Sequence, residues 1–228
     1  MKKIPLPNVR QPDNLTCGPT CLYAIYQFYK DTVGLDSVIA GVSMLEEGGT
    51  LAANLGVHAL KNGYDADIYT FNLKVFDPTW FELDRNQFKQ KLKARQQVRQ
   101  SNQKLSYAIN AYSDFLTLGG NLFFEDLTVD LIRRYLLQSK PIITGLSATY
   151  LYKCKRERPD TQEYDDIHGE PTGHFVVLNG IDEKQNLVYI TDPYKEDPYR
   201  IDINHLVCAI LLGVVTYDAN LLIISPKR

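Results

Sequence analysis

The sequence predicts an α+β fold, because helical patterns dominate its N-terminal part and two strand patterns joined by a polar turn stand near its end. With 228 residues, 44% of them hydrophobic, the chain can bury a sizeable core. We expect one domain, residues 1–228, with a helical insertion at about residues 80–118. The formal net charge of −2 does not indicate a polyanionic partner, so we expect no nucleic acid to bind.

The four cysteines, at positions 17, 21, 154 and 208, are too few for a disulfide scaffold in a chain of this length. Their spacing also lacks the two close pairs typical of a zinc site, and we expect neither a metal nor a cofactor. The basic pair Lys2-Lys3 is not followed by an apolar run, and no stretch approaches the length of a membrane span. These features predict a soluble protein of a reducing compartment, the cytoplasm.

Residues 1–16 are rich in proline and asparagine and predict an extended arm. A helix is expected from Cys17 to about Lys30, since apolar residues recur along it at spacings of three and four: Leu22, Ala24, Ile25, Phe28 and Tyr29. Thr16 can cap this helix, and Pro19 is tolerated within its first turn. The unpaired N–H groups and the positive end of the helix dipole favour a thiolate, so we expect the pKa of Cys17 to be lowered.

Two more helical patterns follow, over Leu35–Leu45 and over Leu51–Asn62. We expect Thr50 to cap the second of these helices and Gly63 to end it. Residues Tyr64–Phe71 then alternate in polarity and predict the first strand.

The composition shifts between Trp80 and Leu118, where basic residues and glutamines surround a thin apolar spine. This pattern predicts either a pair of long surface helices or one bent helix. Two interpretations of the charge remain open: a solvated helical face, and a basic ridge that steers an acidic peptide or partner towards the site.

Three further segments precede the last strands. Leu127–Leu137 predicts an amphipathic helix, and Pro141–Leu146 predicts a short apolar strand. Glu157–Gly173 is acidic and contains hardly an apolar residue, so we expect a long loop there. Loops of that length inside a compact domain are typically lids or disordered.

Residues His174–Ile181 and Leu187–Asp192 predict two antiparallel strands joined by a polar turn. A turn centred on residue 184 pairs Val176 with Asp192 and makes His174 and Asp192 diagonal neighbours, roughly 7–8 Å apart at the backbone. The carboxylate of Asp192 can then hold one ring nitrogen of His174. The other nitrogen is left free to face a thiol.

Cys17, His174 and Asp192 supply the three parts of an activated nucleophile, namely a thiol, a base and a group that orients the base. Gln11 lies six residues before Cys17, so its side-chain amide can swing back beside the thiol. Together with the backbone N–H of Cys17, that amide can stabilise an oxyanion. These four residues form the candidate catalytic site.

A resemblance to a known family is carried by three motifs in the same order: Gln11 through Cys17-Gly-Pro-Thr-Cys21-Leu, Gly173-His174-Phe-Val-Val-Leu-Asn-Gly-Ile-Asp182, and Thr191-Asp192-Pro193. These motifs resemble those of the papain-like peptidases of family thirty-nine of the cysteine peptidases. Members of that family remove double-glycine leader peptides from bacteriocins, usually as the N-terminal domain of an exporting ATPase. The motifs span most of the chain, although residues 65–125 lie outside the resemblance.

The resemblance implies a papain-like fold, with Cys17 in a helical N-terminal part and with His174 and Asp192 on an antiparallel sheet. It also assigns the catalytic roles: nucleophile to Cys17, base to His174, orienting acid to Asp192 and oxyanion donor to Gln11. Thr16 departs from the family pattern, because processing members commonly carry an acid there. No transporter or nucleotide-binding motif follows either, so the chain is more similar to stand-alone, peptidase-like relatives.

Three functions are compatible with these residues. The first is a cysteine peptidase or related amide-cleaving enzyme that acts on a peptide or protein. The second is a peptide-binding module that uses the same cleft without cleavage. The third is an acyl or peptidyl transferase with the same catalytic residues. The substrate and the oligomeric state stay open.

Overall fold

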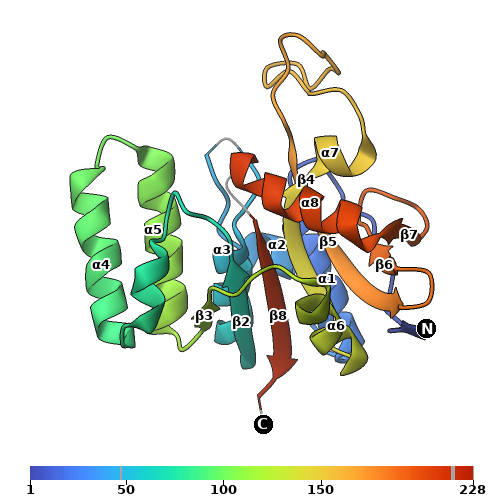
Figure 1. Cartoon of the computed structure of the whole chain (residues 1–228), viewed down its shortest axis with the longest axis horizontal. Helices are drawn as coiled ribbons and strands as arrows, with labels where there is room; N and C mark the ends of the chain where they lie inside the picture. Colours follow the sequence, from blue (N-terminus) through green and yellow to red (C-terminus); the bar gives the residue numbers. More distant parts are fainter. Residues whose placement is uncertain (47, 217–218, 228) are drawn as a thin grey trace.

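The computed structural model describes residues 1–46, 48–216 and 219–227, and within these residues the chain forms one sheet of eight strands with helices on both faces (Figure 1). Seven strands follow the order β3-β2-β8-β4-β5-β6-β7, and β1 pairs with β5 off this path. The pairs are antiparallel except for β2 with β3, which run parallel. The predicted α+β class is therefore confirmed.

The strands are β1 (Lys2–Lys3), β2 (Tyr64–Thr70), β3 (Asn121–Phe123), β4 (Ile142–Ser147), β5 (Gly173–Asp182), β6 (Leu187–Thr191), β7 (Tyr199–Asp202) and β8 (Asn220–Pro226). The helices are α1 (Cys17–Phe28), α2 (Leu35–Gly41), α3 (Ala52–Lys61), α4 (Arg85–Val98), α5 (Gln103–Thr117), α6 (Val129–Leu137), α7 (Ala148–Tyr152) and α8 (Ile203–Leu212), with 3-10 helices η1 (Pro78–Glu82) and η2 (Gly213–Thr216).

Two hydrophobic cores sandwich the sheet. On one face, apolar residues of α1, α3 and α5 pack against alternate residues of the strands, among them Phe175 and Val177 of β5. On the other face, residues of α6 and α8 pack against the intervening residues, among them Val176 and Leu178. β5 is covered on both sides, which explains why its sequence is a nearly continuous apolar run.

The N-terminal helices begin differently from the prediction at two caps. Thr16 is the residue before α1, but its side chain makes no capping hydrogen bond. The residue at the capping position of α3 is Leu51, not Thr50. Thr50 instead donates its hydroxyl to the backbone oxygen of Ser43 at 2.7 Å, which removes it from the capping position. Gly63 has a φ of +84°, as expected for a residue that ends a helix.

The basic segment forms a pair of helices, α4 and α5, which stand at the end of the sheet beyond β3 (Figure 1). Asp84 caps α4 in a capping box with Gln87. Phe88 and Leu92 are buried, while the basic residues of α4 lie mostly on its solvent side. The alternative of one bent helix is wrong, because the chain turns between residues 99 and 102. That this pair is an insertion in a single domain stays a prediction.

A bulge in β5 sets the register of the hairpin formed by β5 and β6. Near the turn, Asp182 pairs with Leu187 and Ile181 with Val188, one residue away from the predicted register. The irregularity between Leu178 and Gly180 removes this offset, so that Val177 pairs with Thr191. The pairs Leu178–Ile190 and Val177–Thr191 therefore follow the predicted register, and the ladder ends before the predicted pair of Val176 with Asp192.

No helix in the described parts of the chain is both long enough and apolar enough to cross a membrane.

Candidate active site

Cys17 is the first residue of α1, and the start of this helix lies directly against β5. A Cβ at Gly18 would lie 2.7 Å from Thr50 Cγ2 and 3.3 Å from the ring of Phe175, so only glycine allows this close approach. One turn further, Cys21 donates its thiol hydrogen to the backbone oxygen of Phe175 over 3.3 Å. The position of the Cys17 sulfur is thus fixed relative to the residue that follows His174.

The surroundings of Cys17 favour the thiolate. Burial alone would raise the pKa of the thiol, but the charge of His174 and its hydrogen bond to the sulfur outweigh burial. Backbone hydrogen bonds from Phe175 and Gly18 act in the same direction, and the pKa of Cys17 is lowered as a result. The direction agrees with the sequence prediction, although the imidazole contributes more than the helix start.

His174 lies at the open end of β5, where it pairs with Leu146 of β4. Its Nε2 is 2.9 Å from Asp192 Oδ1, and its side chain is only 10% exposed. Burial alone would lower the pKa of His174, but the adjacent Cys17 thiolate and Asp192 raise it to about 10. Because Nε2 faces the carboxylate, Nδ1 is the ring nitrogen available to the sulfur.

Asp192 follows the last residue of β6 and is fully buried. Burial disfavours its charge, but hydrogen bonds from His174, Tyr152 and the backbone N–H of Tyr194 lower the pKa of Asp192. The hydroxyls of Tyr152 and Tyr199 donate to Oδ2 over 2.5 and 3.0 Å, and Tyr194 N donates to Oδ1 over 2.9 Å. The carboxylate is therefore held ionised and fixed in orientation behind the ring.

The two tyrosines were not identified from the sequence. Tyr152 ends α7 and Tyr199 begins β7, so they reach Asp192 from opposite sides in the sequence. Burial raises the pKa of both phenols most. The negative charge of Asp192 raises it further. No local pattern distinguishes a tyrosine with this role from a tyrosine of the core.

Gln11 lies on the N-terminal arm, whose backbone runs alongside the segment after β6. Gln11 N donates to the backbone oxygen of Pro193 over 3.0 Å. The side-chain Nε2 donates to the backbone oxygen of Asp13 over 2.7 Å, and the buried Oε1 has no hydrogen-bond partner among the described residues. An amide nitrogen carries two N–H groups, so one remains for a further acceptor.

The rest of the arm is held by the β5 bulge. Ile4 N donates to the backbone oxygen of Asn179 over 2.6 Å, and the side-chain amide of Asn179 donates to Ile4 O over 3.1 Å. A Cβ at Gly180 would lie 2.6 Å from the backbone oxygen of Lys2, so glycine is required for the arm to cross here. The bulge therefore fixes both the hairpin register and the path of the arm that carries Gln11.

A cleft of about 830 Å³ opens beside His174 and Gln11. Much of its wall comes from the loop between α7 and β5, which contributes Cys154, Glu157, Tyr164 and Glu170 among others. This loop is the predicted acidic loop, and it folds on itself through bridges from Glu157 to Tyr164 and to Glu170. Cys17 is only 8% exposed and lies outside the lining of the cleft, so the sulfur is reached past His174.

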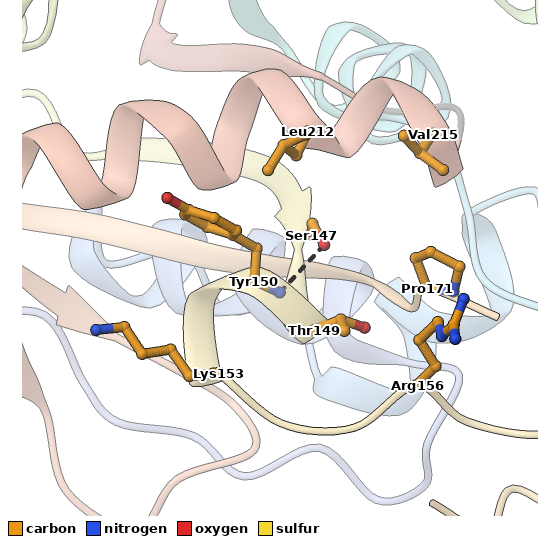
Figure 2. Close-up of a pocket in the computed structure, with 8 residues that line it drawn as sticks. All are labelled: Ser147, Thr149, Tyr150, Lys153, Arg156, Pro171, Leu212 and Val215. Atoms are coloured by element: carbon orange, nitrogen blue, oxygen red, sulfur yellow. Dashed lines mark hydrogen bonds between the residues drawn. The ribbon is translucent and has the colours of Figure 1, made fainter. Parts of the chain in front are cut away.

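A second hollow, of about 300 Å³, shares Pro171 with the cleft (Figure 2). It lies between α7 and the end of α8, and Figure 2 shows the ring of Tyr150 below Leu212, with Lys153 directed away from Arg156. Its lining contains no thiol, imidazole or carboxylate. The cleft beside His174 is therefore the better candidate for chemistry.

The remaining cysteines and histidines lie apart from this cluster or pack within the protein. Cys21 is buried, and burial raises its pKa. The apolar neighbours of Cys208 in the sequence predict a core position, and this prediction is wrong, because Cys208 is exposed. His58 is buried against the hydroxyl of Tyr26, and His168 is exposed beside Asp165. Among the described residues, no group of three or more His, Cys, Asp or Glu side chains is arranged to hold a metal.

Comparison with known proteins gives one family match and several similar solved structures. A family model described as the Peptidase_C39 like family matches residues 3–208. A putative C39-like peptidase from Bacillus anthracis is 14% identical, with a TM-score of 0.55 and coverage of 100% of both chains. This likeness shows the papain-like fold that the resemblance implied.

Two further solved structures are similar with lower TM-scores. A double glycine motif protease from an AMS/PCAT transporter, crystallised in complex with the leader peptide, is 17% identical with a TM-score of 0.48, over 99% of this chain and 95% of that chain. The peptidase domain of Streptococcus ComA, a bi-functional ABC transporter of a quorum-sensing pathway, is 14% identical with a TM-score of 0.45, over 100% of both chains. A search of curated proteins finds no match.

Proposed function

Because the chain belongs to the Peptidase_C39 like family, we propose that it is a cysteine peptidase that cleaves a peptide or amide bond with Cys17, His174, Asp192 and Gln11. One observation carries the proposal: His174 lies 2.9 Å from the buried carboxylate of Asp192, and the same ring lowers the pKa of the Cys17 thiol. A buried imidazole has two ring nitrogens to satisfy, so the identity of its two partners, a thiol and a carboxylate, is what distinguishes His174. The combination of thiol, ring and acid is the arrangement that activates a nucleophile.

The proposed reaction begins with attack of the Cys17 thiolate on the substrate carbonyl carbon. The carbonyl electrons move to the oxygen, and the resulting oxyanion accepts hydrogen bonds from the backbone N–H of Cys17 and from the free N–H of Gln11. His174 gives its Nδ1 proton to the leaving amine as the C–N bond breaks, which leaves a thioester on Cys17. The neutral ring then takes a proton from water, whose oxygen attacks the thioester carbon. The C–S bond breaks, the acid leaves, and the Cys17 thiolate and the protonated His174 are restored.

The test is alkylation of Cys17 by iodoacetamide between pH 5 and pH 9, with the modified residue located by mass spectrometry. A thiolate stabilised by His174 reacts below neutral pH, and Cys17→Ala removes the label while Cys208→Ala does not. Labelling of Cys17 only at alkaline pH would contradict an activated thiol. Cleavage of a mixed peptide library by wild type and not by Cys17→Ala then establishes peptidase activity.

One observation favours the second function, a peptide-binding module. Cys17 is 8% exposed and does not line the cleft, so a peptide could occupy the cleft without reaching the sulfur. Peptide binding by both wild type and Cys17→Ala, with no cleavage by either, would support this alternative. Addition of an amine nucleophile distinguishes the third function, because a transferase then yields an amide product and a hydrolase yields the acid.

A further inference from the structure

We propose that the cleft beside His174 contains a subsite for a cationic group of the substrate, formed by the carboxylates of Glu157 and Glu170. The proposal rests on the proposed function, since it gives a substrate class to the same cleft. The group would be the ammonium or guanidinium of a peptide, placed close to the bond that Cys17 attacks. The backbone pairing of the two glutamates, their lack of ion-pair partners and the apolar residues beside them support this assignment.

The backbone brings the two carboxylates together. Glu157 N donates to Glu170 O over 3.1 Å, and Glu170 N donates to Glu157 O over 2.8 Å, in an antiparallel bridge. Residues directly opposite each other in such a pair project to the same face, and both side chains here line the cleft. Like charges in this arrangement repel each other, which destabilises the loop until a cation lies between or beside them.

Three neighbouring cations are bonded elsewhere. Arg158 donates to Asp160 over 2.9 and 3.1 Å. Lys155 pairs with Asp166, and the ammonium of Lys195 lies over the rings of Tyr152 and Tyr194, at 4.7 and 5.5 Å from their centres.

Within the residues that the structure describes, neither Glu157 nor Glu170 has an ion pair or a side-chain hydrogen bond. Among the described residues, no ion pair therefore neutralises these two carboxylates in the cleft wall.

The acidic wall lies within electrostatic reach of the reacting groups. Glu157 is half-buried, which raises its pKa, while the charge of His174 acts in the opposite direction. Because Glu157 and His174 line the same cleft, a cation held by Glu157 would belong to a residue close to the scissile bond. Leu15, Pro159 and Tyr164 also line the cleft and offer apolar surface for the methylene stem of a lysine or arginine.

The first experiment measures the charge of the cleft without requiring peptide cleavage. Cys17 is modified by methanethiosulfonates that carry an ethyltrimethylammonium, a methyl or an ethylsulfonate group, and each rate is measured by mass spectrometry of the Cys17 peptide. Ratios between reagents cancel any change in the intrinsic reactivity of the thiolate. We expect the cationic reagent to exceed the anionic one by about tenfold or more in the wild type, since two carboxylates line the cleft through which the reagent approaches.

The matched variants separate the two carboxylates from the rest of the loop. Glu157→Gln with Glu170→Gln should reduce the cation-to-anion ratio to about threefold or less. Glu163→Gln is the control, because Glu163 is exposed on the same loop and does not line the cleft. Thermal unfolding of each variant confirms folding. An unchanged ratio in the double variant, or an equal loss in the control, overturns the subsite.

The second experiment uses peptides and distinguishes the sources of the cation. Lysine or arginine is scanned through blocked peptides against norleucine and citrulline, and a free amino terminus is compared with an acetylated one. The subsite predicts that kcat/KM is about tenfold higher when one peptide position carries lysine or arginine than when it carries the neutral residue. This preference should be absent in the double variant. If the wild type cleaves no peptide but still reacts faster with the cationic reagent than with the anionic one, the result contradicts the peptidase and supports the subsite. If the wild type cleaves peptides without any preference for a cation and reacts equally fast with the cationic and anionic reagents, the result overturns the subsite and supports the peptidase.

Discussion

Removal of the phenol oxygen of Tyr152 tests whether the Asp192 carboxylate depends on its buried donors. In Tyr152→Phe, Oδ2 of Asp192 loses the 2.5 Å hydrogen bond and keeps only the hydroxyl of Tyr199. A hydrogen bond to a charged group contributes roughly 1.5–3 kcal/mol, and Asp192 is fully buried, so water does not replace the donor. We expect a loss of about 2 kcal/mol in the free energy of unfolding at neutral pH.

For a chain of 228 residues, that loss corresponds to a decrease in Tm of about 4–8 °C. The pKa of Asp192 is lowered in the folded protein, so its charge stabilises the fold above the pKa of the unfolded chain and ceases to do so as the pH falls through the folded value. Loss of Tyr152 raises the folded pKa. The difference in Tm between wild type and variant should therefore be largest near neutral pH and should shrink below about pH 4.

The assay is thermal unfolding followed by circular dichroism across this pH range, with Tyr150→Phe as the control. Tyr150 lies on the same short helix and is exposed, so removal of its hydroxyl should change Tm by less than about 1 °C. Equal Tm values for Tyr152→Phe and wild type at pH 7 would refute the reasoning. A decrease in Tm that does not depend on pH would show that packing, rather than the charge of Asp192, is responsible.

Three further predictions concern the start of α1 and the reacting groups. Gly18→Ala places a Cβ 2.7 Å from Thr50 Cγ2 and should cost about 1–3 kcal/mol in unfolding experiments, with slower alkylation of Cys17 because the helix start is displaced. Gln11→Ala should lower kcat about 100-fold with little change in KM, measured on any cleaved peptide, and Gln11→Glu should not restore it. His174→Ala removes the partner that lowers the pKa of the buried Cys17 thiol, so the midpoint of iodoacetamide labelling should move above pH 9.

Local patterns predicted the parts of the site that depend on neighbours in the sequence. The helix that begins at Cys17 and the strands on either side of residue 184 follow from apolar spacing, and both are present. The family resemblance and the papain-like fold are likewise confirmed. The bulge between Leu178 and Gly180 was not foreseen, because an irregularity in pairing depends on the arm that crosses it.

The features that sequence reasoning missed are contacts between distant segments. Tyr152 lies 40 residues before Asp192, and nothing in its local pattern marks it as a donor. The amide of Gln11 donates one N–H to the backbone oxygen of Asp13, a local turn contact that its sequence position did not indicate. The charged wall of the cleft likewise depends on pairing between Glu157 and Glu170, thirteen residues apart in a loop without regular periodicity.

The proposed nucleophile, Cys17, is carried by a helix and the proposed base, His174, by the sheet, so their alignment is a tertiary property. A loosened protein that keeps its secondary structure but separates α1 from β5 would retain every reacting group and lose the ion pair between them. Turnover should therefore disappear during heating before the far-ultraviolet circular dichroism signal does. Residual activity would then be a stricter measure of correct folding than helix content, which matters for judging preparations refolded from denaturant.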